Sequence, residues 1–150
     1  MEELFVPGRI CLFGEHSDWA GSYRRMNSEI ERGYTIITGT NQGLFAKAQT
    51  HPDTFIYRAT LDGGEVREFT CPMERDALLD EACAGSFFSY AAGVAYQVLV
   101  HHKVGGLEID NYRTTLPLQK GLSSSAAACV LVARAFDWAY DLKLTVRGEM

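Results

Sequence analysis

One segment constrains this chain more than any other: residues 116–128, LPLQKGLSSSAAA, in which a proline-bearing loop leads into an alanine-rich apolar run. The run predicts a helix, and the first turn of a helix offers free backbone N–H groups and the positive end of its dipole. Gly121 lets the backbone approach a bulky anion, and the serines add hydroxyl donors. The segment therefore predicts a phosphate-binding loop. Its spacing is not that of a Walker A loop, and the alternative interpretation is a serine N-cap on a buried helix.

A second segment, residues 7–19 (PGRICLFGEHSDW), places Gly-Arg shortly before Gly-Glu-His-x-Asp. Together the two segments resemble the motifs of the GHMP kinases, the superfamily of galactokinase, homoserine kinase, mevalonate kinase and phosphomevalonate kinase. Residues 7–18 are similar to the first motif, in the form closest to the sugar kinases. Residues 116–127 are similar to the second motif, which holds ATP. The two motifs lie about as far apart as they do in that superfamily.

Composition excludes several other classes of protein. The chain has 150 residues, of which 47% are hydrophobic and 22% charged, and this suits one domain with a packed core. A net charge of -5, with scattered Lys and Arg, indicates no nucleic-acid partner. The longest apolar stretch, 126–133, is too short to cross a bilayer, and the acidic start does not suit a signal peptide. We expect a cytoplasmic protein without a membrane partner. Its cysteines, without CxxC spacing, are expected to be buried and reduced: Cys11, Cys71, Cys83 and Cys129.

Hydrophobic periodicity predicts an α+β domain, with a mixed or antiparallel sheet and helices on one face. The resemblance implies the N-terminal GHMP kinase domain, a fold like the second domain of ribosomal protein S5, over residues 1–150, with the C-terminal GHMP domain absent. A turn at 62–64 and an edge strand at 107–112 are expected. The remaining strands are expected at 4–14, 34–40, 43–50, 54–60 and 65–71, and the helices at 86–102 and 123–140.

The resemblance also implies how ATP and Mg²⁺ would be held. In the second motif, the positions that match the triphosphate loop are Gly121, Leu122, Ser123, Ser124, Ser125 and Ala126. The hydroxyl of Ser125 occupies the position that would contact Mg²⁺. Lys120 could add positive charge to the loop or stay solvated, and Gln119 stands where the superfamily usually has a small residue.

In the first motif the resemblance assigns Arg9 to catalysis, because the matching arginine of the sugar kinases approaches the reactive hydroxyl and the γ-phosphate. A fixed guanidinium there would stabilise developing negative charge. Glu15, His16 and Asp18 match substrate-binding positions, and carboxylates and imidazole suit sugar hydroxyls. For Arg9 the alternative is a surface arginine at a sheet edge. For Glu15, His16 and Asp18 the alternatives are a solvated turn or a metal site.

Three departures from the galactokinase pattern limit the choice of substrate. Cys11 replaces an asparagine, Trp19 replaces a tyrosine, and residues 22–27 (SYRRMN) replace a glycine-rich segment. Trp19 could lie under a sugar ring or fill the core. Arg24 and Arg25 could bind a carboxylate or phosphate of the substrate, or remain solvated.

We therefore expect a magnesium-dependent kinase that transfers the γ-phosphate of ATP to a hydroxyl of a small sugar. The alternatives are phosphorylation of a non-sugar alcohol, as by mevalonate kinase, and a regulator that binds sugar and ATP without turnover. In the superfamily the catalytic aspartate and a third, glycine-rich motif follow beyond position 150. We thus expect the 150-residue chain alone to be inactive, and to self-associate because the apolar helix at 126–133 would lose part of its cover.

Overall fold

The computed structural model describes residues 2–15, 17, 20–31, 33–61, 63–117 and 123–145. Strand β1 comes first, and a short 3₁₀ helix, η1, follows it. Three α-helices and four further strands complete the described part of the chain. The bounds are β1 Glu2–Phe13, η1 Ala20–Arg25, β2 Ile36–His51, β3 Thr54–Thr60, β4 Val66–Pro72, α1 Arg75–Cys83, α2 Ser89–His101, β5 Gly106–Thr114 and α3 Ser124–Tyr140.

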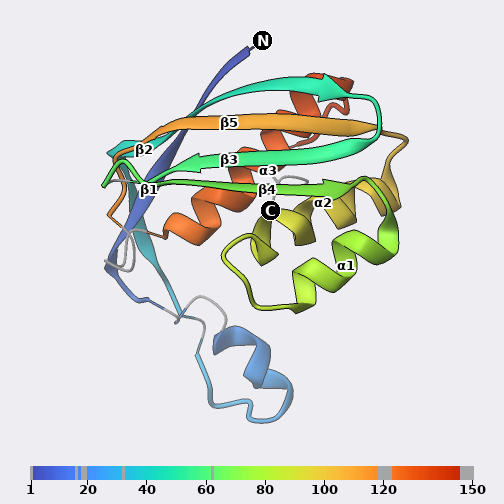
Figure 1. Ribbon diagram of the computed structural model, residues 1–150. Helices are drawn as coiled ribbons and strands as arrows, with labels where there is room; N and C mark the ends of the chain where they lie inside the picture. Colours follow the sequence, from blue (N-terminus) through green and yellow to red (C-terminus); the bar gives the residue numbers. More distant parts are fainter. Residues whose placement is uncertain are drawn as a thin grey trace.

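The strands form one mixed sheet in the order β1-β2-β5-β3-β4. Strands β3 and β5 pair in parallel, and the other neighbours pair antiparallel. All three α-helices lie on one face of this sheet, with α3 against β1, β2 and β5 and with α1 near β4 (Figure 1). The predicted α+β class with helices on one face is confirmed.

The core lies between this sheet and the helices, because side chains alternate between the two faces of a strand. In β3 the inward residues are Phe55, Tyr57 and Ala59, all buried. Phe55 stacks on Phe136 of α3, with ring centroids 6.0 Å apart. Such aromatic pairs combine a large buried area with a defined geometry. No described helix is long and apolar enough to span a bilayer.

The expectation that residues 107–112 form an edge strand is wrong, because β5 is the central strand and pairs with both β2 and β3. Its alternation of apolar and polar residues arises from a sheet that is covered on one face only. Leu107 and Ile109 are fully buried under the helices, whereas Glu108 and Asp110 point to the open face. Alternation distinguishes the faces of a strand but carries no information on its place in the sheet.

Two other expectations were wrong in detail, and one helix was missed. The two strands expected at 34–40 and 43–50 are one long strand, β2, with an irregularity where three residues of β2 lie opposite Gly8. Helix α1 was not predicted, because it is short and buries only Leu78. The cysteines are not uniformly buried: Cys71 is, but Cys83 is exposed and Cys11 and Cys129 are half-buried.

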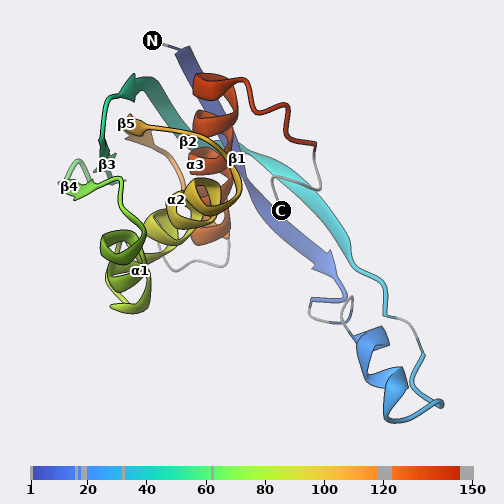
Figure 2. The ribbon, with the colours of Figure 1, turned by 90° about the vertical axis from the view of Figure 1, so that its right-hand side faces the viewer.

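The outer halves of β1 and β2 leave the body of the domain and carry η1 beyond its edge (Figure 2). We call the described residues within 10–42 the arm. No described residue of the arm is buried, although it contains several large apolar side chains. Those exposed by more than half are Leu12, Phe13, Met26, Tyr34, Ile36 and Ile37.

Candidate functional site

The start of α3 carries the predicted phosphate-binding residues. Ser123 precedes the helix with a left-handed backbone, at φ 56°, and its side chain makes no capping hydrogen bond. The interpretation of a serine side chain that caps the helix therefore does not apply to Ser123. Its hydroxyl does not bond to the N–H groups of the first turn, which can bind other groups. Ser124 is half-buried, and Ser125 and Ala126 are exposed. Gly121 and Leu122 lie outside the described residues, as do Gln119 and Lys120.

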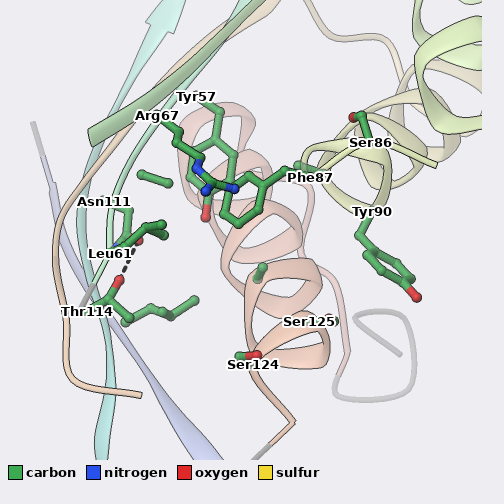
Figure 3. Close-up of a pocket in the computed structure, with 14 residues that line it drawn as sticks. Tyr57, Leu61, Arg67, Ser86, Phe87, Tyr90, Asn111, Thr114, Ser124 and Ser125 are labelled. Atoms are coloured by element: carbon green, nitrogen blue, oxygen red, sulfur yellow. Dashed lines mark hydrogen bonds between the residues drawn. The ribbon is translucent and has the colours of Figure 1, made fainter. Parts of the chain in front are cut away.

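A pocket of about 440 Å³ opens beside this first turn. In Figure 3 its walls are the sheet on one side and the start of α2 on the other, with Ser124 and Ser125 at one end. Pockets of this size hold small organic ligands and cofactors. The lining residues are Leu44, Tyr57, Ala59, Leu61, Arg67, Ser86, Phe87, Tyr90, Ala91, Asn111, Thr114, Ser124, Ser125 and Ala128.

The walls of the pocket are mainly apolar, with a few polar groups among them. The guanidinium of Arg67 lies 4.8 Å from the ring centroid of Phe87, a cation–π contact that links β4 to the segment before α2. Its Nε donates to Glu65 at 2.7 Å, and this hydrogen bond raises the pKa of Arg67. Burial raises the pKa of the Tyr57 phenol, so this group stays protonated at neutral pH.

At the sheet side, Asn111 and Thr114 are buried polar residues joined by a hydrogen bond of 2.9 Å. These two and the other wall residues outside α3 were missed by sequence reasoning, because they are scattered over five elements and the loops between them. The one available signal was misinterpreted. Phe87 and Tyr90 lie in the segment expected as a helix at 86–102, where their helical spacing with other apolar residues indicates a buried face, yet they are 42% and 61% exposed and line the pocket.

In the first motif the structure pairs two predicted site residues with each other. Arg9 on β1 donates from its Nη2 to Oε1 of Glu15 at 3.1 Å, and both side chains are close to half exposed. His16, Asp18 and Trp19 lie outside the described residues. Arg24 and Arg25 are exposed in η1 of the arm and do not line the pocket.

The loop after β1 is tied back to the start of β2. Ser17 donates its hydroxyl to the carbonyl oxygens of Gly14 and Tyr34, at 2.7 and 2.9 Å. Gly14 has φ 79°, and a Cβ there would lie 1.9 Å from the Tyr34 carbonyl oxygen. Glycine adopts a positive φ freely and has no Cβ to clash with the Tyr34 carbonyl. Gly14, the glycine of Gly-Glu-His-x-Asp, is therefore needed for the backbone turn at this position.

Both motifs lie at the same end of the sheet. Pro7 of β1 pairs with Gly43 of β2, and the backbone N–H of Thr115 donates to the Gly43 carbonyl at 3.0 Å. The Thr115 hydroxyl also accepts from the Gly43 N–H at 2.9 Å. Thr115 immediately precedes the loop of the second motif. Gly43 therefore lies between Pro7 of the first motif and Thr115, which leads into the second motif. Arg9 lies two residues beyond Pro7 on β1.

Comparison with known proteins identifies relatives of one kind. Residues 89–149 match the family described as the GHMP kinases N terminal domain. The chain is 33% identical over 139 residues to a galactokinase of Pyrococcus furiosus, covering 92% of this chain and 34% of that protein. It is 31% identical over 144 residues to a galactokinase of Thermococcus kodakarensis, covering 95% of this chain and 35% of that one. This chain spans about a third of the length of these relatives.

The fold is similar to that of the solved mevalonate kinase of Methanococcus jannaschii. The TM-score is 0.64 at 18% identity, and the match covers 99% of this chain and 43% of that structure. At this identity the likeness concerns the fold alone. The family match, the galactokinase relatives and the fold agree, and this chain belongs to the GHMP kinase superfamily, whose N-terminal domain it carries.

Proposed function

We propose that the protein is an ATP-dependent kinase that transfers the γ-phosphoryl group to a hydroxyl of a sugar. The observation that carries the proposal is the pocket beside α3, which opens onto a first turn that the Ser123 side chain does not cap. The similarity to two galactokinases along nearly the whole chain supports a sugar as acceptor.

In this proposal the base of the nucleotide enters the pocket, and its phosphates lie at the start of α3. The apolar walls suit a flat heterocycle, and the Phe87 ring with the Arg67 guanidinium provides a face for stacking. The N–H groups of the first turn and the hydroxyls of Ser124 and Ser125 would then bind the phosphate oxygens, together with Gly121 and Leu122.

These residues suit a magnesium–nucleotide complex. Hard cations take oxygen ligands, and the hydroxyl of the exposed Ser125 offers one at the phosphate end of the pocket. Bound magnesium would neutralise charge on the phosphates. Because a dissociative phosphoryl transfer needs positioning and positive charge rather than covalent help, Arg9 would stabilise the charge of the moving group.

Substrate hydroxyls would be bound by Glu15, His16 and Asp18. The ion pair between Arg9 and Glu15 would keep the proposed catalytic side chain beside one of the proposed substrate-binding side chains. A carboxylate that keeps a guanidinium in one orientation also lowers the cost of ordering it at each turnover.

A coupled assay of ADP release from the intact protein tests the proposal, with neutral sugars, sugar acids and mevalonate as acceptors. We expect ADP release that depends on a neutral sugar. Turnover of mevalonate alone would instead establish an alcohol kinase of another specificity. Binding of sugar and ATP without any ADP release would indicate a sensing protein, and the proposed kinase activity would be rejected.

A further inference from the structure

Strand β5 contains a bulge beside the pocket. Asp110 pairs with Lys47 and Arg113 with Phe45, so two residues of β5 lie opposite the single residue Ala46 of β2. The first of the two is Asn111, whose side chain is 2% exposed. Its Nδ2 donates to the carbonyls of Phe45 and Arg113, at 3.0 and 3.1 Å. Asn111 thereby satisfies backbone groups at the irregularity.

This network fixes the direction of one more hydrogen bond. With both N–H groups of Asn111 committed to carbonyls, its Oδ1 accepts from the hydroxyl of Thr114 at 2.9 Å. The reverse orientation of the amide would set its oxygen against two carbonyl oxygens, so the amide cannot turn around. A threonine hydroxyl has one proton and two lone pairs. The proton of Thr114 is therefore used inside the sheet.

Thr114 also lines the pocket, and because its proton is held by Asn111, its oxygen can only accept a hydrogen bond from a bound ligand (Figure 3). The hydroxyl of Ser86 is also committed, because it donates to the Glu81 carboxylate and accepts from the Phe88 N–H. The other hydroxyls of the lining, those of Tyr57, Ser124 and Ser125, can rotate to donate or to accept. Among the described lining residues, Thr114 is thus a hydroxyl whose hydrogen-bonding direction is set by the fold.

We propose that Thr114 determines base specificity, because it accepts a hydrogen bond from a 6-amino purine and disfavours a 6-oxo purine. The inference rests on the proposed function, since it takes the pocket as the base site. An exocyclic amine donates to the free lone pair, whereas a carbonyl at the same position would face lone pair with lone pair. A polar group that loses its partner in a buried site is penalised as well.

The test compares three ligands that share a triphosphate and differ in the group at purine C6, with ITP also carrying a proton at N1, by calorimetric titration of the intact protein. ATP carries an amine at C6, purine riboside triphosphate a hydrogen, and ITP an oxygen. We expect ATP to bind about tenfold more tightly than ITP, as one hydrogen bond gained or lost would give, with the unsubstituted purine between them.

Variants separate the direction of the hydrogen bond from the mere presence of the hydroxyl. Thr114→Val removes the acceptor and should reduce the preference for ATP over ITP to less than about twofold, the expectation for a site without this hydrogen bond. Thr114→Ser keeps the hydroxyl and should keep the preference. Asn111→Leu frees the hydroxyl proton, so the preference should fall although Thr114 is intact. Thr115→Val is the matched control, because that hydroxyl bonds to the backbone of Gly43, and it should leave the preference unchanged.

The outcomes distinguish the inference from the proposed function. Equal affinity of the unaltered protein for ATP and ITP, or a full preference retained in Thr114→Val, would overturn the role of Thr114 while nucleotide binding itself stands. Failure to bind any of the three nucleotides would reject the base site and, with it, the inference. If Thr114→Val does not fold, the ligand series on the unaltered protein and the Thr114→Ser variant decide.

Discussion

At the scale of single residues, Arg9 and Glu15 show how the first motif could work. They form an exposed ion pair, a kind of contact that contributes little to stability in water. Their pairing is therefore better explained by positioning than by folding. We expect Arg9→Ala to lower kcat by about 10²- to 10³-fold, the usual cost of removing one donor that stabilises transition-state charge. The KM for ATP should change much less, because the guanidinium acts as charge develops.

Steady-state kinetics with the best acceptor sugar would measure this effect. Arg113→Ala is the matched control, because Arg113 is also exposed but lies over the Phe45 ring, 3.8 Å from its centroid. A similar loss of kcat in both variants would contradict the role of Arg9. So would an Arg9→Ala enzyme that keeps its full rate.

Ser123 provides a second prediction at this scale. A left-handed backbone costs a non-glycine residue roughly 1–2 kcal/mol, and glycine escapes this cost but loses more entropy on folding. We expect Ser123→Gly to raise the free energy of unfolding by up to about 1 kcal/mol. Ser124→Gly, inside the first turn of α3, should lower it by about 0.5–1 kcal/mol. Urea unfolding of both variants would show whether the free energy of unfolding changes in opposite directions. A loss of stability in Ser123→Gly would refute the proposed backbone strain at Ser123.

At the scale of elements, the open face of the sheet holds an ion-pair network. Arg58 of β3 donates to Glu68 of β4 and to Glu108 of β5, and Gln49 of β2 donates to Glu108 as well. The hydrogen bond from Arg58 is the main cause that lowers the pKa of Glu108, and the bond from Gln49 adds to it. Four strands are thus joined through side chains on the face that the helices do not cover.

This network makes stability depend on pH. The pKa of Glu108 is lowered in the folded state. The ionised carboxylate therefore makes its full contribution to the free energy of unfolding above the unfolded-state pKa of about 4.3, and that contribution is lost as the pH falls through the folded-state pKa. Glu108→Gln should lower the free energy of unfolding by about 1 kcal/mol at pH 7. It should also make the free energy of unfolding decrease less steeply below about pH 4.5. Urea midpoints between pH 3 and pH 7 would measure this, and Arg58→Met should flatten the same window. An unchanged acid profile in both variants would contradict it.

The elements also show what the sequence can predict and where it fails. The expected strand at 54–60 coincides with β3, and α3 begins one residue after the expected start. In both cases a strong local pattern coincides with tertiary burial. The central place of β5 depends on pairing with residues more than 40 positions away, which no local pattern records. The pocket, equally, depends on Arg67, Phe87 and Thr114 meeting across the fold.

At the scale of the whole molecule, the arm is the least covered part of the described structure. Two paired strands alone are marginally stable in water, and large apolar side chains on such a ribbon favour association. The helix at 126–133, where association was expected, is largely covered, since Ala127, Leu131, Val132 and Ala133 are buried. We therefore expect the isolated 150-residue chain to self-associate through the arm instead. Phe13 and Ile36, which pair in the register and are 72% and 55% exposed, are the residues to change.

Sedimentation velocity would test this on the chain at micromolar concentration. The double variant Phe13→Ser with Ile36→Ser should sediment as a smaller species. Val66→Ser with Leu79→Ser is the control, since these apolar side chains are also exposed but lie on the body of the domain. Equal sizes for all three proteins would show that the arm does not drive association.

The central position of β5 has a consequence for synthesis on the ribosome. Strands β1 and β2 form one hairpin and β3 and β4 another, and β5 alone joins the two in the sheet. Because β5 comes after all of them in the chain, a nascent polypeptide holds two separate hairpins until residue 114 has left the exit tunnel. Long-range pairing of this kind is slow and leaves strand edges open in the meantime. Codons that slow elongation just before β5 would therefore extend the period in which the unfinished protein needs a chaperone.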